Sequence, residues 1–211
     1  MNTPRAEPLR SPAAVRALAS PVRQEVVDAL QAAGPRTVAE LAALLGRPAD
    51  GLYFHVRALE KVGLVVERER RQEGRHVSAV YDLAERPVRL SYDRPVRRAD
   101  IARVVRGAIR LSLRDFQGAL VREGATAGPE RALWGGRAKG WVTRAELREM
   151  NGLLARMHEI LHAGRPREGA RCMSLGFVLA PVKTTSRRPA QAGSRRRAEG
   201  AIKADGKENT R

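Results

Sequence analysis

The chain has 211 residues, 43% of them hydrophobic, and a net charge of +17, a composition typical of a soluble globular protein that attracts polyanions such as nucleic acid. The single cysteine, Cys172, excludes an intramolecular disulfide and any zinc site built from several cysteines. Since no apolar run approaches the ~20 residues of a membrane span and the N-terminus lacks the apolar stretch of a secretory signal, we expect a cytoplasmic, nucleoid-associated protein.

The positive charge does not by itself locate a nucleic-acid-binding surface. Residues 1–83 contain 12 Lys or Arg and 10 Asp or Glu, a net charge of only +2. Residues 184–211 contain 8 basic and 3 acidic residues, and they lack hydrophobic periodicity. We expect this basic tail to be disordered and the Pro-rich residues 1–11 to be flexible. The binding surface therefore has to be found from motifs.

Helix signals dominate the N-terminal third of the chain. A short helix is predicted near residues 12–19, and a second one begins at a Ser-Pro pair and spans about residues 21–33. Thr37 and Glu40 form a T-x-x-E capping box that opens a third helix. A fourth helix is predicted over residues 48–62. The turn of about four residues between the third and fourth helices is typical of a helix-turn-helix unit.

Two β-type segments follow the fourth helix. Val66 begins a stretch of alternating polarity, and the sequence HVSAVYDL predicts a second strand beyond the polar tip RQEGR. A hairpin directly after a helix-turn-helix is the order of a winged helix, in which the hairpin is the wing. Residues 12–84 are therefore predicted to form a winged helix-turn-helix DNA-binding domain.

The rest of the chain predicts a second, smaller module. Residues 85–98 are rich in Pro and Arg and indicate a linker. A long helix is predicted over residues 99–123, followed by a glycine-broken strand (ALWGGRAKGWV), a helix that opens at Thr143 and a last strand (RCMSLGFVLAPV). Residues 99–183 thus predict an α-β-α-β module for dimerisation or effector binding, and the whole chain falls in the α+β class.

Three sequence segments within about residues 13–83 resemble the ArsR-type winged-helix transcriptional regulators. They are LASPVRQEVVDAL, TVAELAALLGRPADGLYFHVRALEKVGLV and AVYDL. The resemblance implies that the helix at residues 48–62 enters the major groove of double-stranded DNA. Metal-sensing members carry a cysteine pair on the first helix of the DNA-reading unit, but here that helix reads VAELAALL. We therefore expect no metal site and no cofactor.

Outward-facing positions of the fourth helix and basic positions of the hairpin supply the DNA-binding candidates. Side chains on a helix in the major groove read base edges, and a basic hairpin tip grips phosphate or the minor groove. The alternatives are that Tyr53 and Phe54 pack on the wing, and that Glu67, Glu69 and Glu73 neutralise its arginines. The candidates are Arg47, Tyr53, Phe54, Arg57, Lys61, Arg70, Arg71 and Arg75.

The long helix supplies a predicted dimerisation surface. Apolar residues recur along it every three or four positions, and two copies would place two reading helices about one DNA turn apart. The alternative is that this face packs only against its own module. The candidate dimerisation residues are Ile101, Val105, Ala108 and Leu111.

Other polar groups give no sign of catalysis. His158 and His162 stand at i, i+4, but the sequence offers no obvious third ligand, so we expect a surface or interface pair. No nucleophile–base pair or cofactor loop indicates an enzyme. The sequence therefore predicts a sequence-specific regulator that acts as a homodimer at a palindromic operator. The alternatives are a winged-helix protein-interaction module and an architectural nucleic-acid-binding protein without operator specificity.

Overall fold

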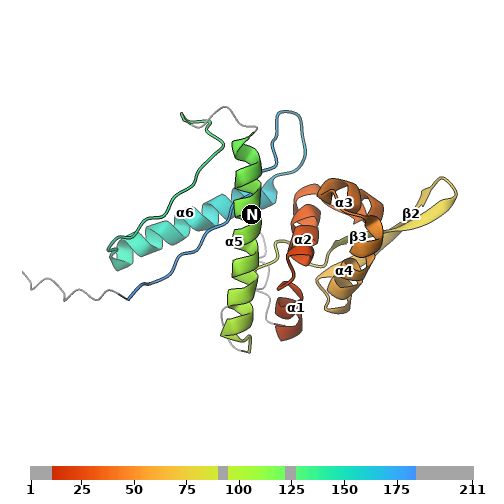
Figure 1. Ribbon diagram of the computed structural model, residues 1–211, viewed down its shortest axis with the longest axis horizontal. Coiled ribbons are helices and arrows are strands. Elements are labelled where there is room, and N and C mark those ends of the chain that lie inside the picture. Colours follow the sequence, from red (N-terminus) through yellow and green to blue (C-terminus); the bar gives the residue numbers. More distant parts are fainter. Residues whose placement is uncertain (1–10, 90–94, 122–126, 184–211) are drawn as a thin grey trace, which may run out of the picture. The chain divides into compact units, whose positions relative to one another are not determined.

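A computed structural model describes residues 11–89, 95–121 and 127–183 of the chain (Figure 1). The predicted flexible start (residues 1–10) and the predicted basic tail (residues 184–211) lie outside the described residues. The helices are α1 (Pro12–Ala17), α2 (Pro21–Ala33), α3 (Val38–Leu45), α4 (Ala49–Lys61), α5 (Arg98–Leu120) and α6 (Arg144–Ala163). The strands are β1 (Arg36–Thr37), β2 (Val65–Glu73) and β3 (His76–Leu83).

The three strands form one antiparallel sheet in the order β1-β3-β2. Figure 1 shows the β2–β3 hairpin, which is the wing, projecting beyond the helices. The predicted mixed class and the predicted winged helix-turn-helix at the N-terminus are confirmed.

The start of α3 is fixed by the predicted capping box. The Thr37 hydroxyl accepts a hydrogen bond from the Glu40 N–H at 3.2 Å, and the Glu40 carboxylate accepts one from the Thr37 N–H at 2.7 Å. Both bonds satisfy backbone donors that a helix N-terminus leaves free. At the other end, Gly46 has the left-handed backbone conformation (φ 60°), which lets the chain turn into α4.

Removing this cap is expected to destabilise the winged helix. Thr37→Ala loses the side-chain acceptor and should lower the free energy of unfolding by about 0.5–2 kcal/mol. Ser20→Ala is the matched control, because Ser20 is also an N-cap residue but its side chain makes no capping hydrogen bond. Urea unfolding followed by circular dichroism measures both. Equal losses in the two variants would contradict a capping role for Thr37.

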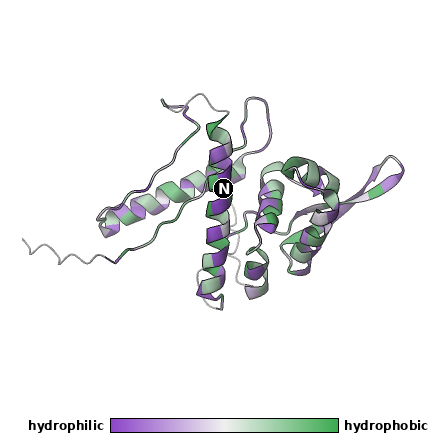
Figure 2. Ribbon diagram, viewed as in Figure 1, coloured by the Kyte–Doolittle hydropathy of each residue, from purple (hydrophilic) through white to green (hydrophobic). Residues whose placement is uncertain are grey.

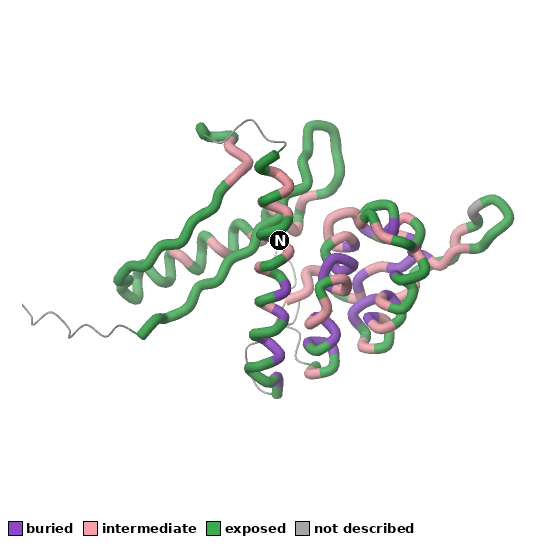
Figure 3. Tube along the Cα trace, in the orientation of Figure 1, coloured by how far each residue is buried: buried purple, intermediate pink, exposed green. Residues whose placement is uncertain are grey.

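A single hydrophobic core joins the winged helix to the first half of α5. Leu30, Leu41 and Leu59 are fully buried, and Ile101 and Val104 of α5 belong to the same cluster. Figure 3 accordingly shows buried residues on α2, α4 and the first half of α5. The helix that was predicted to open a separate module is therefore partly built into the N-terminal domain.

A buried amide ties α5 to the other helices. The Nε2 group of Gln24 on α2 donates hydrogen bonds to the carbonyl of Leu18 at 2.7 Å and to that of Val104 at 2.9 Å. A Cβ atom at Gly107 would lie only 2.9 Å from this amide. The glycine thus permits the close approach of α5 to α2.

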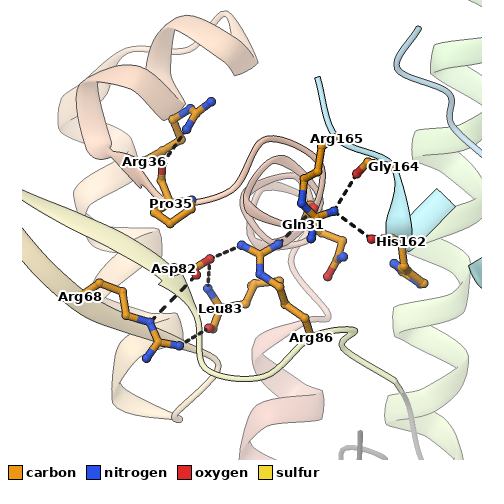
Figure 4. A network of polar contacts seen from close by, with 10 residues as sticks. All are labelled: Gln31, Pro35, Arg36, Arg68, Asp82, Leu83, Arg86, His162, Gly164 and Arg165. Carbon is orange, nitrogen blue, oxygen red and sulfur yellow. Dashed lines mark hydrogen bonds and ion pairs between the residues drawn. The ribbon is translucent and has the colours of Figure 1, made fainter. Parts of the chain in front are cut away.

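The predicted linker, residues 85–98, is not free of the domain where the structure describes it. Val96 is buried, and Val88 packs against the core. Arg86 donates to the carbonyl of Gln31 at 3.1 Å and pairs with Asp82 (Figure 4). These contacts fix the chain as it leaves the sheet. Residues 90–94 lie outside the described residues.

The two strands predicted in the second module are not formed within the described chain. Residues 132–142 and 172–182 belong to no strand of the described sheet, although α6 between them begins at Arg144 as predicted. An extended segment becomes a strand only when a neighbour accepts and donates its backbone hydrogen bonds. Residues 179–183 belong to a second unit of the chain and are exposed.

Candidate nucleic-acid interface

Helix α4 has one face for the core and one face for a partner. Leu52, Val56 and Leu59 point into the core. On the other side, Tyr53 is 52% exposed and Phe54 is 71% exposed. Both aromatic side chains therefore keep a large exposed surface that a partner could contact.

Two cations lie on the same exposed side of α4. Arg57 and Lys61 are one helical turn apart, and both are exposed. The Nη1 atom of Arg57 lies 2.8 Å from the Glu60 carboxylate, and this hydrogen bond raises the pKa of Arg57 above its ordinary value. Because solvent screens an exposed ion pair of this kind, Arg57 can exchange Glu60 for DNA at small cost.

The wing carries arginines in two different situations. Arg70 pairs with Glu67 at 2.8 Å, next to an irregularity in the strand register between Glu67 and Glu69. Arg75 stands beside Gly74 at the exposed tip and makes no ion pair with any described side chain. The tip arginine is thus the wing cation most available to a phosphate.

Arg71 ties the wing to α3. Its guanidinium lies 3.2 Å from Glu40 and 3.6 Å from Glu69. Glu40 also belongs to the capping box, so one carboxylate links the start of α3 to the hairpin. The predicted neutralisation of wing arginines by neighbouring carboxylates is therefore seen at Arg70 and Arg71.

Arg47, a predicted DNA-binding residue, forms an ion pair within the chain. It precedes α4, and its guanidinium lies 2.7 Å from the carboxylate of Glu25 on α2. Glu25 is only 6% exposed and also pairs with Arg114 of α5. The sequence pattern does not identify Glu25 as a buried residue, because a glutamate beside the apolar stripe of a helix is usually exposed to solvent. Glu25 thus links α2 to the start of α4 and to α5.

The predicted dimerisation residues divide between the core and the surface. Ile101 is 8% exposed and packs in the core of its own chain, which leaves it little surface for a dimer interface. Val105 and Leu111 are half-buried, and Ala108 is exposed. Only these three retain surface that a partner could cover, and their role in dimerisation stays a prediction.

Three histidines have pKa values below the ordinary value, with burial as the main cause. Burial, with Arg23 and Arg47 nearby, lowers the pKa of His55 on α4. Burial also lowers the pKa values of His158 and His162, whose ring centroids lie 5.4 Å apart. No third His, Cys, Asp or Glu gathers with this pair within the described residues.

Comparison with known proteins agrees with the geometry of the N-terminal domain. A family model described as a helix-turn-helix domain matches residues 18–68, which run from the end of α1 into β2. A search of curated proteins finds no match. Among the helices that the structure describes, none combines the length and apolarity needed to span a membrane. The N-terminal domain is a helix-turn-helix of the kind that marks a DNA-binding regulator, and the match does not distinguish the ArsR type from others.

Proposed function

We propose that the protein is a transcriptional regulator that binds a specific double-stranded DNA sequence, with α4 in the major groove and the wing on the backbone. The observation that carries the proposal is the exposed face of α4, which presents Tyr53, Phe54, Arg57 and Lys61 opposite its buried stripe. A groove about 12 Å wide admits one helix, and side chains of these types contact base edges, thymine methyl groups and phosphates there.

The proposal includes the ArsR type, a cytoplasmic site of action and a homodimer at a palindromic operator. One winged helix contacts only a short stretch of groove, and two related by a two-fold axis double the number of bases read. The resemblance of residues 13–83 supports the ArsR type. The mechanism is occupancy of the operator, and the proposal assigns no catalytic chemistry to the chain.

Selection from random duplex DNA by the full-length protein tests the proposal. We expect enrichment of one palindromic motif, bound with an affinity that falls steeply as salt concentration rises, because Lys and Arg displace counterions from phosphates. Salt-dependent binding without any enriched motif would instead indicate an architectural protein. No binding at low salt would indicate a protein-interaction module, for which the near-neutral charge of residues 1–83 is the supporting observation.

Arg75 at the tip of the wing is expected to contact DNA phosphates and no base edges. Arg75→Ala should weaken operator and non-specific DNA alike, and should reduce the slope of log affinity against log salt by about 0.9, the value for one lost phosphate contact. Arg148→Ala removes an exposed arginine of α6 and serves as the control, with no expected change. Fluorescence anisotropy titrations at several salt concentrations measure the slope. A loss confined to the operator would show that Arg75 reads bases instead.

A further inference from the structure

The C-terminal arm, defined as residues 127–178, exposes many large hydrophobic side chains. Eleven of its large hydrophobic side chains are exposed. Its helix α6 is 20 residues long and has no buried residue. Figure 3 shows the arm as mostly exposed from end to end. Scattered exposed apolar residues are ordinary, but so many on neighbouring elements mark an interaction site.

Helix α6 has a second apolar face beside the one it uses within the chain. Its half-buried apolar residues, Met150, Leu154 and Leu161, share one stripe. The exposed residues Leu153, Met157 and Ile160 follow at i, i+4 and i+7, and so form a neighbouring stripe. Figure 2 shows the mixture of hydrophobic and hydrophilic residues along this helix. The second stripe is left without a partner by the described chain.

Residues 172–178, which follow α6, belong to no strand of the described sheet. Their large residues, Met173, Leu175 and Phe177, alternate with small ones. Gly176 lies so close to α5 that a Cβ atom there would collide with the Ser112 side chain, while the Phe177 ring lies 5.3 Å from the His158 ring of α6. Residues 172–178 therefore pack against both helices. Within the described chain their backbone groups make no backbone–backbone hydrogen bond, which leaves an open edge.

We propose that the arm of a second copy of the chain covers this surface. In the proposed interface the segments 172–178 of the two copies pair antiparallel, and the two α6 helices lie side by side with Leu153, Met157 and Ile160 between them. The inference rests on the dimeric form of the proposed function and deepens it by placing the interface on the arm.

Self-complementarity favours a second copy over an unrelated partner. A two-fold axis through an antiparallel pair brings the same residues of both copies together. The stripe of Leu153, Met157 and Ile160 is centred near Met157, so antiparallel α6 helices that cross there bring Leu153 of one copy opposite Ile160 of the other. Residues 172–178 contain no charge, so they do not suit DNA.

Two glutamate substitutions on α6 of the full-length protein test the inference. Leu153→Glu places a carboxylate in the proposed interface, and Ala155→Glu places one on the exposed side of the same helix. Sedimentation at micromolar concentration without DNA should find the wild type and Ala155→Glu as dimers. Leu153→Glu should raise the dimer dissociation constant by roughly 100-fold or more, because an unpaired charge would be buried. Its circular dichroism should match that of the wild type.

A second pair of variants tests the strand pairing. Ser174→Pro removes one backbone donor from the open edge and should weaken the dimer, whereas Ser174→Ala keeps the donor and should not. A monomeric wild type, or a Leu153→Glu variant as dimeric as Ala155→Glu, overturns the inference.

Binding to operator DNA, measured on the same samples, separates this inference from the proposed function. If the protein binds operator DNA specifically and Leu153→Glu remains dimeric, the proposed function is supported and the arm interface is wrong. If Leu153→Glu dissociates the dimer and the wild type binds no DNA, the arm interface is supported and the proposed function is wrong.

Discussion

Replacing Leu52 by alanine is expected to lower the free energy of unfolding by about 2–5 kcal/mol, the range for a leucine truncated in a well-packed core. Leu52 lies on the buried stripe of α4, is 1% exposed and belongs to the core cluster that also contains Leu41 and Tyr81. A small domain has a total stability of about 5–15 kcal/mol, so this single change removes a large part of it. DNA binding should be lost in proportion to the fraction of unfolded protein.

Phe54→Ala is the matched control for Leu52→Ala on the same helix. Phe54 faces solvent, so its truncation should change the free energy of unfolding by less than about 0.5 kcal/mol. Because this ring lies on the proposed reading face, we expect DNA affinity to fall while stability holds. Urea unfolding and anisotropy titrations on both variants give the two quantities. A large loss of stability from Phe54→Ala, or none from Leu52→Ala, would contradict the division of α4 into a packing face and a reading face.

The N-terminal domain was predictable because its signals are local. The capping box of Thr37 and Glu40, the turn at Gly46 and the apolar spacing on α4 each act within a few residues, and each appears in the structure where the sequence places it. The same spacing identified the outward residues of α4, since a residue absent from the buried stripe of an amphipathic helix faces away from the core.

What the sequence leaves open are the partners of each apolar face. The stripe on α5 was correctly identified, but its period does not say whether Ile101 meets another copy or α1 and α2 of its own chain. The two predicted strands fail for a related reason, because strand pairing depends on a neighbour that periodicity does not name. Likewise, the link from Glu25 to Arg47 and Arg114 joins residues 22 and 89 positions apart. Such contacts follow from the tertiary fold.

The largest effect on specificity is expected from Arg57, the cation at the middle of the exposed face of α4. If its guanidinium reads a guanine through two hydrogen bonds, Arg57→Ala should weaken operator binding by about 1–3 kcal/mol, or roughly 5- to 150-fold in Kd. Arg57→Lys separates reading from charge, because lysine keeps the cation but lacks the planar fork that matches a base edge. Arg57→Lys should therefore lose operator affinity and retain affinity for non-specific DNA.

Glu60 provides the matched control for Arg57, because it holds the Arg57 guanidinium at 2.8 Å in the free protein. Glu60→Gln removes this competing carboxylate while leaving Arg57 in place, so operator affinity should hold or rise by less than about 1 kcal/mol. In the double variant with Arg57→Ala, most of that gain should disappear, since the carboxylate acts chiefly through Arg57. Anisotropy titrations against the selected operator and a scrambled duplex give the affinities of the wild type, Arg57→Ala, Glu60→Gln and the double variant. Unchanged affinity of Arg57→Ala for both duplexes would show that α4 is not the reading helix.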